Sequence, residues 1–385
     1  MRHDSHIFQL GLPLILSCSS PIPEPGGAIL PGLLDSDGPG VLTIEGDFEV
    51  AFSAAFAGQP DGMIPPTRVK EYFPGRVTYA TAEGRVVIPP ADEDPVPADG
   101  EKAAVSIKVR GNSSLQECPF PKLKLKVHKS YRGGTAFERT KKIKIGTHCA
   151  DDAAPGNIGR LRHQKATWRE AFVFALLEEL EIVSQRAKPI SIEYVDTSTD
   201  ETTERKAFVF EHQNVLAARM GGQAMEDPQE TYEGDPLEQM NQQTLARIHL
   251  FHSLIGNWDW ELGTLERGVA VWNTDVLIMP DGQQIPLPAD FDLASIVTGA
   301  EIRERDIPPD VLPDEPNLHV RQAAHFLSWK LGTLLSSDEL AVAKQHFIDH
   351  KVAIRARLEE ALLGDEGRDL ARTHIDAFFR ALELL

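Results

Sequence analysis

Four polar side chains that suit phosphate chemistry lie within residues 254–293. Asp259 follows a stretch with helical periodicity, and Asn273 lies in a predicted strand after it. Asp290 and Asp292 follow the next predicted strands. One acid of such a set can orient or deprotonate an attacking hydroxyl, while amide and carboxylate oxygens are hard ligands for Mg²⁺. We therefore predict Asp259 as a catalytic base and Asn273, Asp290 and Asp292 as Mg²⁺ ligands.

The order of these residues favours a phosphoryl-transfer site, because protein kinases also present Asp, then Asn, then Asp along the chain. The alternative is structural, since Asp259 can occupy a turn while Asp290 and Asp292 cap a helix. Each aspartate alone fits that alternative better. The ordered set, together with basic strands upstream, fits the phosphoryl-transfer site better.

A basic segment supplies candidate partners for phosphate. Residues 122–144 contain nine Lys or Arg and one acid, in a chain of net charge −19. Apolar residues alternate with Lys124 and Lys126 in one predicted strand and with Lys144 in another, so these lysines lie opposite the apolar faces. An ammonium group there can reach a phosphate as a point charge. Solvated strand faces are the alternative for each lysine.

The turn that precedes these strands reads RGNSS. Glycine lets the backbone approach a phosphate, and Asn and Ser side chains can donate to its oxygens. An ordinary hairpin turn is the alternative. We predict as nucleotide-binding residues Arg110, Asn112, Ser113 and Ser114.

Two glutamates complete the predicted cofactor site. Glu170 lies in the first turns of a helix predicted from the four-residue recurrence of Trp168 and Phe172. It can pair with a lysine, as the glutamate of the kinase fold does. Glu211 ends the apolar strand 207–211 and is predicted to line the nucleotide pocket. A surface position is the alternative for both.

Taken in order, these motifs resemble the CotH family of spore-coat-type atypical kinases over residues 100–295. The resemblance implies ATP and Mg²⁺ as cofactors and transfer to a Ser or Thr hydroxyl of a protein. The chain departs from the family at Trp260, where a basic residue is common, and in a longer spacing from Asp259 to Asn273. HipA-like kinases share part of the pattern, but the RGNSS turn favours CotH. The matching positions are Arg110, Gly111, Asn112, Ser113, Ser114, Lys124, Lys126, Asp259, Asn273, Asp290 and Asp292.

Composition excludes several other classes. A net charge of −19 over 385 residues argues against nucleic-acid binding, and no run of 18 apolar residues predicts a membrane span. The histidines include no HExxH motif and the serines no GxSxG motif, so we predict neither a zinc site nor a serine hydrolase. Two alternatives to an active enzyme of this family remain: an exported pseudokinase or binding lipoprotein without turnover, and a HipA-like intracellular kinase.

The predicted elements run from a β-rich front, through a helix near residue 165, to a helical rear. This order predicts an α+β protein with a two-lobed, atypical protein-kinase-like fold. The β-rich N-terminal lobe is predicted over residues 43–215 and the C-terminal lobe, with its terminal helices, over residues 216–385. One of the short front strands is predicted at Phe48–Phe52.

The N-terminus predicts export. Ile7–Leu16 is an apolar stretch that fits the core of a signal peptide, and the following Ser17-Cys18 resembles a bacterial lipobox. We predict a signal peptide over residues 1–18, lipidation of Cys18, a flexible tether over residues 19–42 and a lipoprotein of the bacterial cell envelope. Cleaved soluble export and a cytosolic N-terminus are the alternatives.

Cysteine parity agrees with export. If Cys18 carries lipid, Cys118 and Cys149 remain as an even pair. An oxidising compartment favours a disulfide between them, and two unrelated buried thiols are the alternative.

Replacing Cys18 by Ala tests the anchor. The variant is expected to leave the membrane fraction, because the acyl chains that hold the protein there can no longer be attached. Cell fractionation and metabolic labelling with a fatty acid measure this. A Cys18→Ala variant that still incorporates the label would contradict lipidation at this cysteine.

Overall fold

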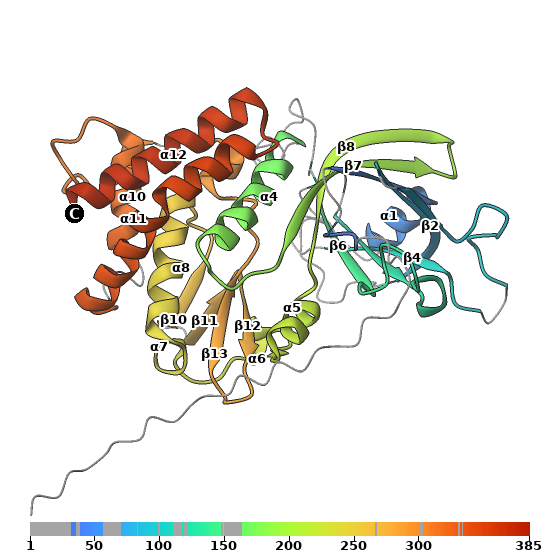
Figure 1. Ribbon diagram of the computed structural model, residues 1–385, viewed down its shortest axis with the longest axis horizontal. Helices are drawn as coiled ribbons and strands as arrows, with labels where there is room; N and C mark the ends of the chain where they lie inside the picture. Colours follow the sequence, from blue (N-terminus) through green and yellow to red (C-terminus); the bar gives the residue numbers. More distant parts are fainter. Residues whose placement is uncertain are drawn as a thin grey trace, which may run out of the picture.

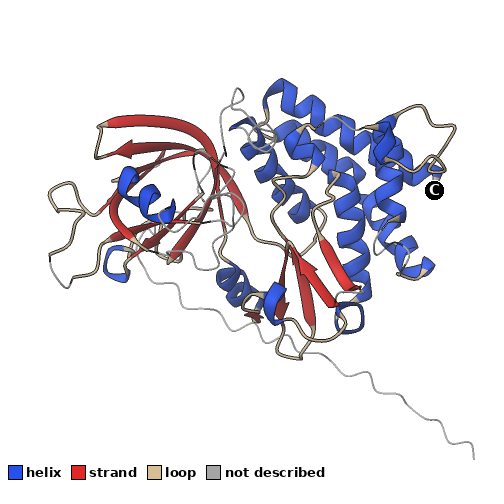
Figure 2. Cartoon of the chain, turned by 180° about the vertical axis from the view of Figure 1, so that it is seen from behind, coloured by secondary structure: helices blue, strands red, loops and turns tan. Residues whose placement is uncertain are grey.

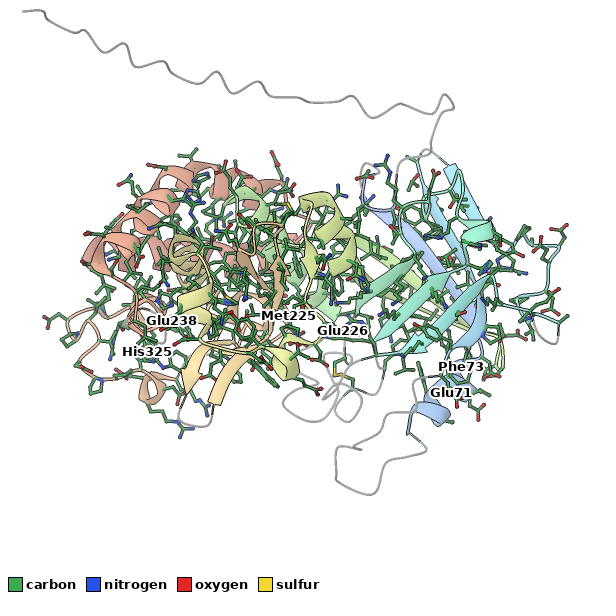
Figure 3. All side chains as sticks on the ribbon, turned by 90° about the horizontal axis from the view of Figure 1, so that it is seen from below. Glu71, Phe73, Met225, Glu226, Glu238 and His325 are labelled. Carbon is green, nitrogen blue, oxygen red and sulfur yellow. A yellow bond between two sulfur atoms is a disulfide. The ribbon has the colours of Figure 1, made fainter. Side chains whose placement is uncertain are left out.

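The computed structural model shows two lobes side by side, a strand-rich one and a helix-rich one (Figure 1). In Figure 3, Glu71 and Phe73 lie in the strand-rich lobe, while Glu238 and His325 lie in the other lobe. The structure describes residues 32–35, 39–56, 71–82, 84–98, 101–110, 118, 120, 122–147, 149, 164–265, 268–300, 303–329, 332 and 334–385.

The N-terminal lobe is a closed β-barrel. Its strands follow the order β1-β7-β8-β6-β5-β4-β2, and β1 pairs again with β2 to close the ring, while β3 adds to the outer edge of β2. The β-rich lobe is thus confirmed, although a closed seven-stranded barrel differs from the N-terminal lobe of typical protein kinases. The strands are β1 (Gly40–Gly46), β2 (Phe73–Thr81), β3 (Gly84–Ile88), β4 (Val105–Val109), β5 (Leu123–Val127), β6 (Lys142–Thr147), β7 (Ala187–Asp196) and β8 (Glu201–Phe210).

Strict alternation along the strands builds this barrel. In β5, Leu123, Leu125 and Val127 are buried in the barrel core, whereas Lys124 and Lys126 are half-buried on the outer face. Side chains of a strand point alternately to its two faces, so a sequence of this pattern buries one face only. The lysines of neighbouring strands consequently gather on one outer surface.

Two predictions for the front of the chain are wrong. Residues Phe48–Phe56 form helix α1 rather than a strand, because Asp47 Oδ1 accepts a hydrogen bond from Val50 N at 2.9 Å and starts a helix. The predicted tether over residues 19–42 also includes packed residues. Leu33 is 2% exposed in the barrel core, and β1 already begins at Gly40.

The C-terminal lobe combines helices with two small sheets (Figure 2). β10 pairs with β11, and β12 lies between β13 and β9. The α+β class and the helical rear are confirmed. The elements are α4 (Gln164–Glu179), α5 (Gln213–Met220), β9 (Gln223–Ala224), α6 (Pro228–Thr231), α7 (Pro236–Gln239), α8 (Gln242–Ile255), β10 (Glu261–Leu265), β11 (Gly268–Trp272), β12 (Thr274–Ile278), β13 (Gln284–Pro288), α9 (Ser295–Thr298), α10 (Leu318–Ser328), α11 (Ser337–Glu360) and α12 (Gly364–Leu384); short 3₁₀ turns form at Lys129–Tyr131 and Glu304–Asp306.

Helix α4 connects the lobes. Its apolar residues belong to the core of the C-terminal lobe, although the sequence placed them within the N-terminal lobe of residues 43–215. On its other side, Trp168 Nε1 donates to the backbone oxygens of Ile190 and Ala207 in the barrel, each at 3.1 Å. The helix therefore holds the barrel and the helical core in one arrangement.

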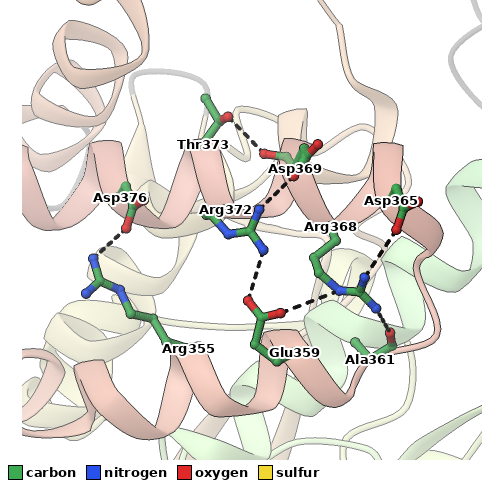
Figure 4. Close-up of polar contacts among 9 residues, drawn as sticks. All are labelled: Arg355, Glu359, Ala361, Asp365, Arg368, Asp369, Arg372, Thr373 and Asp376. Atoms are coloured by element: carbon green, nitrogen blue, oxygen red, sulfur yellow. Dashed lines mark hydrogen bonds and ion pairs between the residues drawn. The ribbon is translucent and has the colours of Figure 1, made fainter.

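Helices α11 and α12 pack as an antiparallel pair at the rear of the lobe. Arg372 of α12 donates to Glu359 of α11 at 2.9 Å, and Arg355 of α11 pairs with Asp376 of α12 (Figure 4). Ser336 and Glu339 form a capping box at the start of α11. Among the described residues, no helix has the length and apolarity to cross a bilayer. The predicted signal peptide and Cys18 lie outside the described residues.

The predicted disulfide between Cys118 and Cys149 is present, with the two Cα atoms 4.6 Å apart. Both cysteines are buried. The bond joins the segment before β5 to the segment after β6, the two strands that carry most of the outer lysines. The disulfide therefore cross-links the two chain segments that flank the lysine-bearing strands β5 and β6.

Removing this bond by the double change Cys118→Ser and Cys149→Ser is expected to destabilise the protein by about 2–4 kcal/mol, because the unfolded chain regains the entropy that the cross-link removes. Urea unfolding under non-reducing conditions measures the difference. As the control, a reducing agent should lower the unfolding midpoint of the parent chain and leave that of the double variant unchanged. Equal midpoints for the parent and the double variant would contradict a stabilising bond.

Candidate active site

The turn after α8 positions Asp259. The helix ends at Gly256, which has a left-handed φ of +63°. A Cβ there would lie 2.8 Å from the Cβ of Ser295, so only glycine fits. The next residue, fully buried Asn257, accepts a hydrogen bond through Oδ1 from the amide of Asp259 at 3.0 Å. The motif GNxD is therefore a helix stop followed by a side chain that holds the aspartate backbone.

Trp260, where the chain departs from the CotH pattern, is a core residue. It is 3% exposed and stacks on His252 of α8, with ring centroids 4.1 Å apart and planes 10° apart. His252 Nδ1 lies 3.1 Å from Nδ2 of Asn257. The aromatic pair thus supports the turn that carries Asp259.

Asn273 lies between β11 and β12, not within a strand as predicted. Its φ is +51°, a left-handed value that Asn tolerates better than most residues. Its Nδ2 donates to the backbone oxygen of Asp259 at 2.7 Å and to Oδ2 at 3.0 Å. Trp272 Nε1 donates to Oδ1 of the same carboxylate at 3.1 Å. The structure therefore brings Asp259 and Asn273 together.

The electrostatic surroundings of Asp259 link it to the D-x-D segment. Burial raises the pKa of Asp259, and the negative charges of Asp290 and Asp292 raise it further. The hydrogen bonds from Trp272 and Asn273 act in the opposite direction. A carboxyl group with a raised pKa accepts a proton more readily than an ordinary aspartate.

The D-x-D segment follows β13. Phe291 is fully buried against Phe174 of α4 and Phe251 of α8, with ring centroids 5.1 and 5.8 Å away. Asp290 has a left-handed φ of +55°, and Asp292 lies just before α9. The segment is a turn and not a strand end, yet both carboxylates reach the same cation because the ring between them is anchored.

That cation is Lys122, which the sequence analysis did not select. Its Nζ lies 2.9 Å from Asp292 Oδ2 and 3.6 Å from Asp290 Oδ1. Lys122 is 8% exposed and precedes β5. Burial lowers the pKa of Lys122, but the neighbouring carboxylates outweigh burial and the pKa is raised. The only sequence signal was its position as the lysine of the row nearest the RGNSS turn.

Two predicted cofactor residues, Glu170 and Arg110, lie around this ion pair. Burial raises the pKa of Glu170 to about 8, while the charge of Lys122 pulls it down. Burial lowers the pKa of Arg110, and the nearby carboxylates oppose that change. Arg110 Nη2 donates to the backbone oxygen of Ile145 at 2.9 Å. The cluster therefore combines groups from the barrel, from α4 and from the D-x-D segment.

The three predicted lysines lie on the outer face of the barrel at different distances from the cluster. Lys124 lies opposite Lys144 on the neighbouring strand, and burial together with like charges lowers the pKa of Lys124 to about 8. Lys144 Nζ donates to Gln213 Oε1 at 3.0 Å, and the charge of Asp290 acts on it. Lys126 lies one row further away, 5.4 Å from the ring centroid of Tyr72.

A further acid, Asp275 of β12, was also missed. It is half-buried, and burial raises its pKa while the charge of Lys144 lowers it. Nothing in its local sequence separates it from an ordinary strand residue. Its negative charge acts on Lys144 of the barrel, which places it among the charged groups near the site.

Glu211 is buried, which excludes the surface alternative, and its place in a nucleotide pocket stays a prediction. Its carboxylate is fully buried and accepts from Arg219 Nη2 at 2.9 Å and from the backbone amide of Arg186 at 3.3 Å. These contacts fasten the end of β8 to α5. The remaining predicted residues of the RGNSS turn lie outside the described residues: Gly111, Asn112, Ser113 and Ser114.

The donor set fits Mg²⁺ and a phosphate together. Two carboxylates and one amide supply hard oxygen atoms, and Nδ2 of Asn273 is already engaged, which leaves its Oδ1 as the ligand atom. Lys122 and Lys144 supply positive charge for phosphate oxygens. Asp259 is close enough to Asp290 and Asp292 for their charges to raise its pKa, and its carboxylate could accept a proton from an acceptor hydroxyl.

Comparisons with known proteins add little to this geometry. No protein-family model matches the chain, and no curated protein shows significant similarity to it. The crystal structure of a Helicobacter pylori proinflammatory kinase, CtkA, aligns with 69% of this chain and 92% of its own chain, at 11% identity and a TM-score of 0.31. That score is too low to support an argument about this protein. The resemblance to the CotH family thus depends on the motifs.

The buried glutamate predicts how stability depends on pH. Because the pKa of Glu170 rises from 4.5 to about 8 on folding, the folded protein keeps this proton at higher pH than the unfolded chain. Its contribution to the free energy of unfolding is fully present below about pH 4.5 and is lost as the pH rises through about 8. Glu170→Gln should flatten that decline.

Melting temperatures between about pH 5 and pH 8.5 measure this effect. Glu178→Gln, at an exposed position of the same helix, is the matched control and should keep the parent slope. A Glu170→Gln variant with the parent slope would show that Glu170 is already ionised in the folded protein.

Proposed function

We propose that this protein is an ATP-dependent phosphotransferase of the CotH-like atypical kinase type, which uses Mg²⁺ and ATP to phosphorylate a Ser or Thr hydroxyl of a protein. The observation that carries the proposal is the buried lysine bridge between the lobes. Lys122 of the barrel meets Asp290 and Asp292 of the C-terminal lobe, beside Glu170 of α4. A lysine, a helix glutamate and a metal-binding aspartate are the parts that kinases assemble around ATP phosphates.

The barrel residues have the task of holding phosphate. Lys122 and Lys144 bring ammonium groups to the candidate site from the segment before β5 and from the neighbouring strand β6. Glu170 of α4 is buried near Lys122, and the charge of Lys122 favours the ionised form of Glu170 against the effect of burial. Phe210 lies under Lys144 and Arg110, which are 5.6 and 5.3 Å from its ring centroid, and it supplies an apolar floor.

The C-terminal residues have the task of holding the metal and the acceptor. Asn273, Asp290 and Asp292 would hold Mg²⁺, which when bound would supply positive charge against the negative charge of the phosphate. Asp259 receives the proton of the acceptor hydroxyl, and its raised pKa suits that step. Trp272 and Asn273 keep its carboxylate in place through hydrogen bonds.

The proposal extends to where the protein works. We infer a lipoprotein of the bacterial cell envelope, held by Cys18 and facing protein substrates there. An exported binding protein without turnover is the second candidate. The exported location that we infer favours it, because ATP is scarce outside the cytoplasm.

Two aspartate variants separate catalysis from binding. Asp259→Asn removes the base but no metal ligand, so phosphate transfer should fall about 10²- to 10⁴-fold while ATP still binds. Asp290→Ala removes a hard oxygen ligand, so the affinity for Mg·ATP itself should weaken. Autophosphorylation with labelled ATP measures transfer, and calorimetry measures binding.

Asp281→Ala is the matched control, because Asp281 is an exposed aspartate in the turn between β12 and β13. It should leave both quantities unchanged. Unchanged Mg·ATP affinity in Asp290→Ala would refute the metal assignment. ATP binding without transfer by the parent chain would identify the protein as the non-catalytic binding protein.

A further inference from the structure

Helix α11 carries two histidines one turn apart, His346 and His350, at the end of α4. Glu181 follows α4 and faces them. One potential ligand atom from each of these three side chains lies within 4.8 Å of the others. The sequence has no HExxH motif, and no zinc site was predicted from it. The spacing HxxxH of His346 and His350 was the missed signal.

The hydrogen bonds of the two imidazoles define which nitrogens are available. Nε2 of His346 lies 2.8 Å from the backbone oxygen of Leu180, and Nδ1 of His350 lies 2.7 Å from that of His346. A carbonyl oxygen accepts only, so each of these nitrogens donates. The lone pairs are therefore on Nδ1 of His346 and Nε2 of His350. Metal-bound histidines in proteins are oriented by the same kind of bond to a carbonyl oxygen.

The two segments that carry the three side chains are fixed by packing. Leu180 is fully buried, and the amide of Ile182 closes the helix end by donating to Leu177 O at 2.9 Å. On α11, Phe347 is fully buried next to His346. The ion pairs of α11 with α12 in Figure 4 hold the same helix from its other side. The ligands therefore stand on rigid backbone, which lowers the cost of ordering them on binding.

We propose that Glu181, His346 and His350 form a binding site for a divalent transition cation of the zinc class, which joins α11 to the end of α4. Two imidazole nitrogens and one carboxylate oxygen are ligands that Zn²⁺ takes, with water in the fourth position. Ligand atoms around such an ion lie about 3.4 Å apart. The three side chains have ligand atoms within 4.8 Å of one another, so binding would draw them closer together. The site is separate from the oxygen-only set at Asp290.

The two proposed metal sites have different ligands, so an experiment can distinguish binding at one from binding at the other. Imidazole favours Zn²⁺ and its neighbours in the transition series, whereas carboxylate and amide oxygens favour Mg²⁺. Zinc binding at α11 should thus be insensitive to excess Mg²⁺. It is also independent of phosphotransferase activity, so failure of either proposal leaves the other intact.

Calorimetric titration of the full chain with zinc chloride, in excess Mg²⁺, tests the site. We expect saturable binding that weakens about tenfold or more in His350→Ala and in Glu181→Gln. Zinc should also raise the melting temperature of the parent chain but not of these variants, because it binds the folded state only. Circular dichroism checks that the variants are folded. We expect them to fold, because Glu181 is exposed and His350 is half-buried.

His128→Ala and Asp290→Ala are the controls. The first removes a histidine of the barrel, and the second removes a ligand of the proposed Mg²⁺ site. Both should bind zinc like the parent chain. Parent-like zinc affinity in His350→Ala would overturn the proposal, as would loss of zinc binding in Asp290→Ala alone.

Discussion

The contact of Lys122 with Asp290 and Asp292 is the charged interaction between the two lobes on which the candidate site depends. It joins a barrel strand to the turn after β13, and the lysine is almost completely buried. Burying a charge is costly unless a partner compensates it, so the buried lysine and the two aspartates depend on one another. Removing one side alone would leave an unpaired charge in the interior, at a cost of about 3–5 kcal/mol.

Two residues on the aspartate side of this contact have an unfavourable, left-handed backbone conformation. Asn273 and Asp290 both have left-handed φ values, +51° and +55°. The hairpin of β12 and β13 joins them, because the amide of Ala289 donates to the backbone oxygen of Asn273 at 3.0 Å. Buried Phe291 and Asn257 anchor the turns on either side. Such strain persists only where the surrounding packing over-determines it, and it is concentrated at functional sites.

Positive and negative charges lie on opposite sides of the candidate site. The chain is acidic overall, yet the outer faces of β5 and β6 carry lysines in register with one another. Like charges and burial both disfavour protonated Lys124, which lowers its pKa to about 8. An anion bound at this surface would relieve the repulsion between the lysines. Asp290 and Asp292 nearby would repel that anion unless a cation lay between them. The charges around the candidate site thus favour a phosphate and a divalent metal together.

Local patterns in the sequence predicted much of this protein. Period-two alternation predicted the lysine-bearing strands, the glycine after α8 predicted its end, and cysteine parity predicted the pair Cys118 and Cys149. The ordered acids predicted that Asp259 and Asn273 meet. The strands and the helix end depend on residues that are close together in the sequence. The disulfide was predicted from the number of cysteines.

Only the tertiary structure decided which of several equivalent residues enter the site. Lys122, Lys124 and Lys126 have the same spacing, but only Lys122 meets the aspartates, because the turn after β13 docks at that end of β5. Glu170 and Glu211 looked alike, yet arginines of neighbouring segments hold Glu211. Closure of the barrel through β1 and β2 is likewise a long-range pairing. Sequence periodicity states which face a side chain takes, whereas packing between distant segments determines what lies opposite that face.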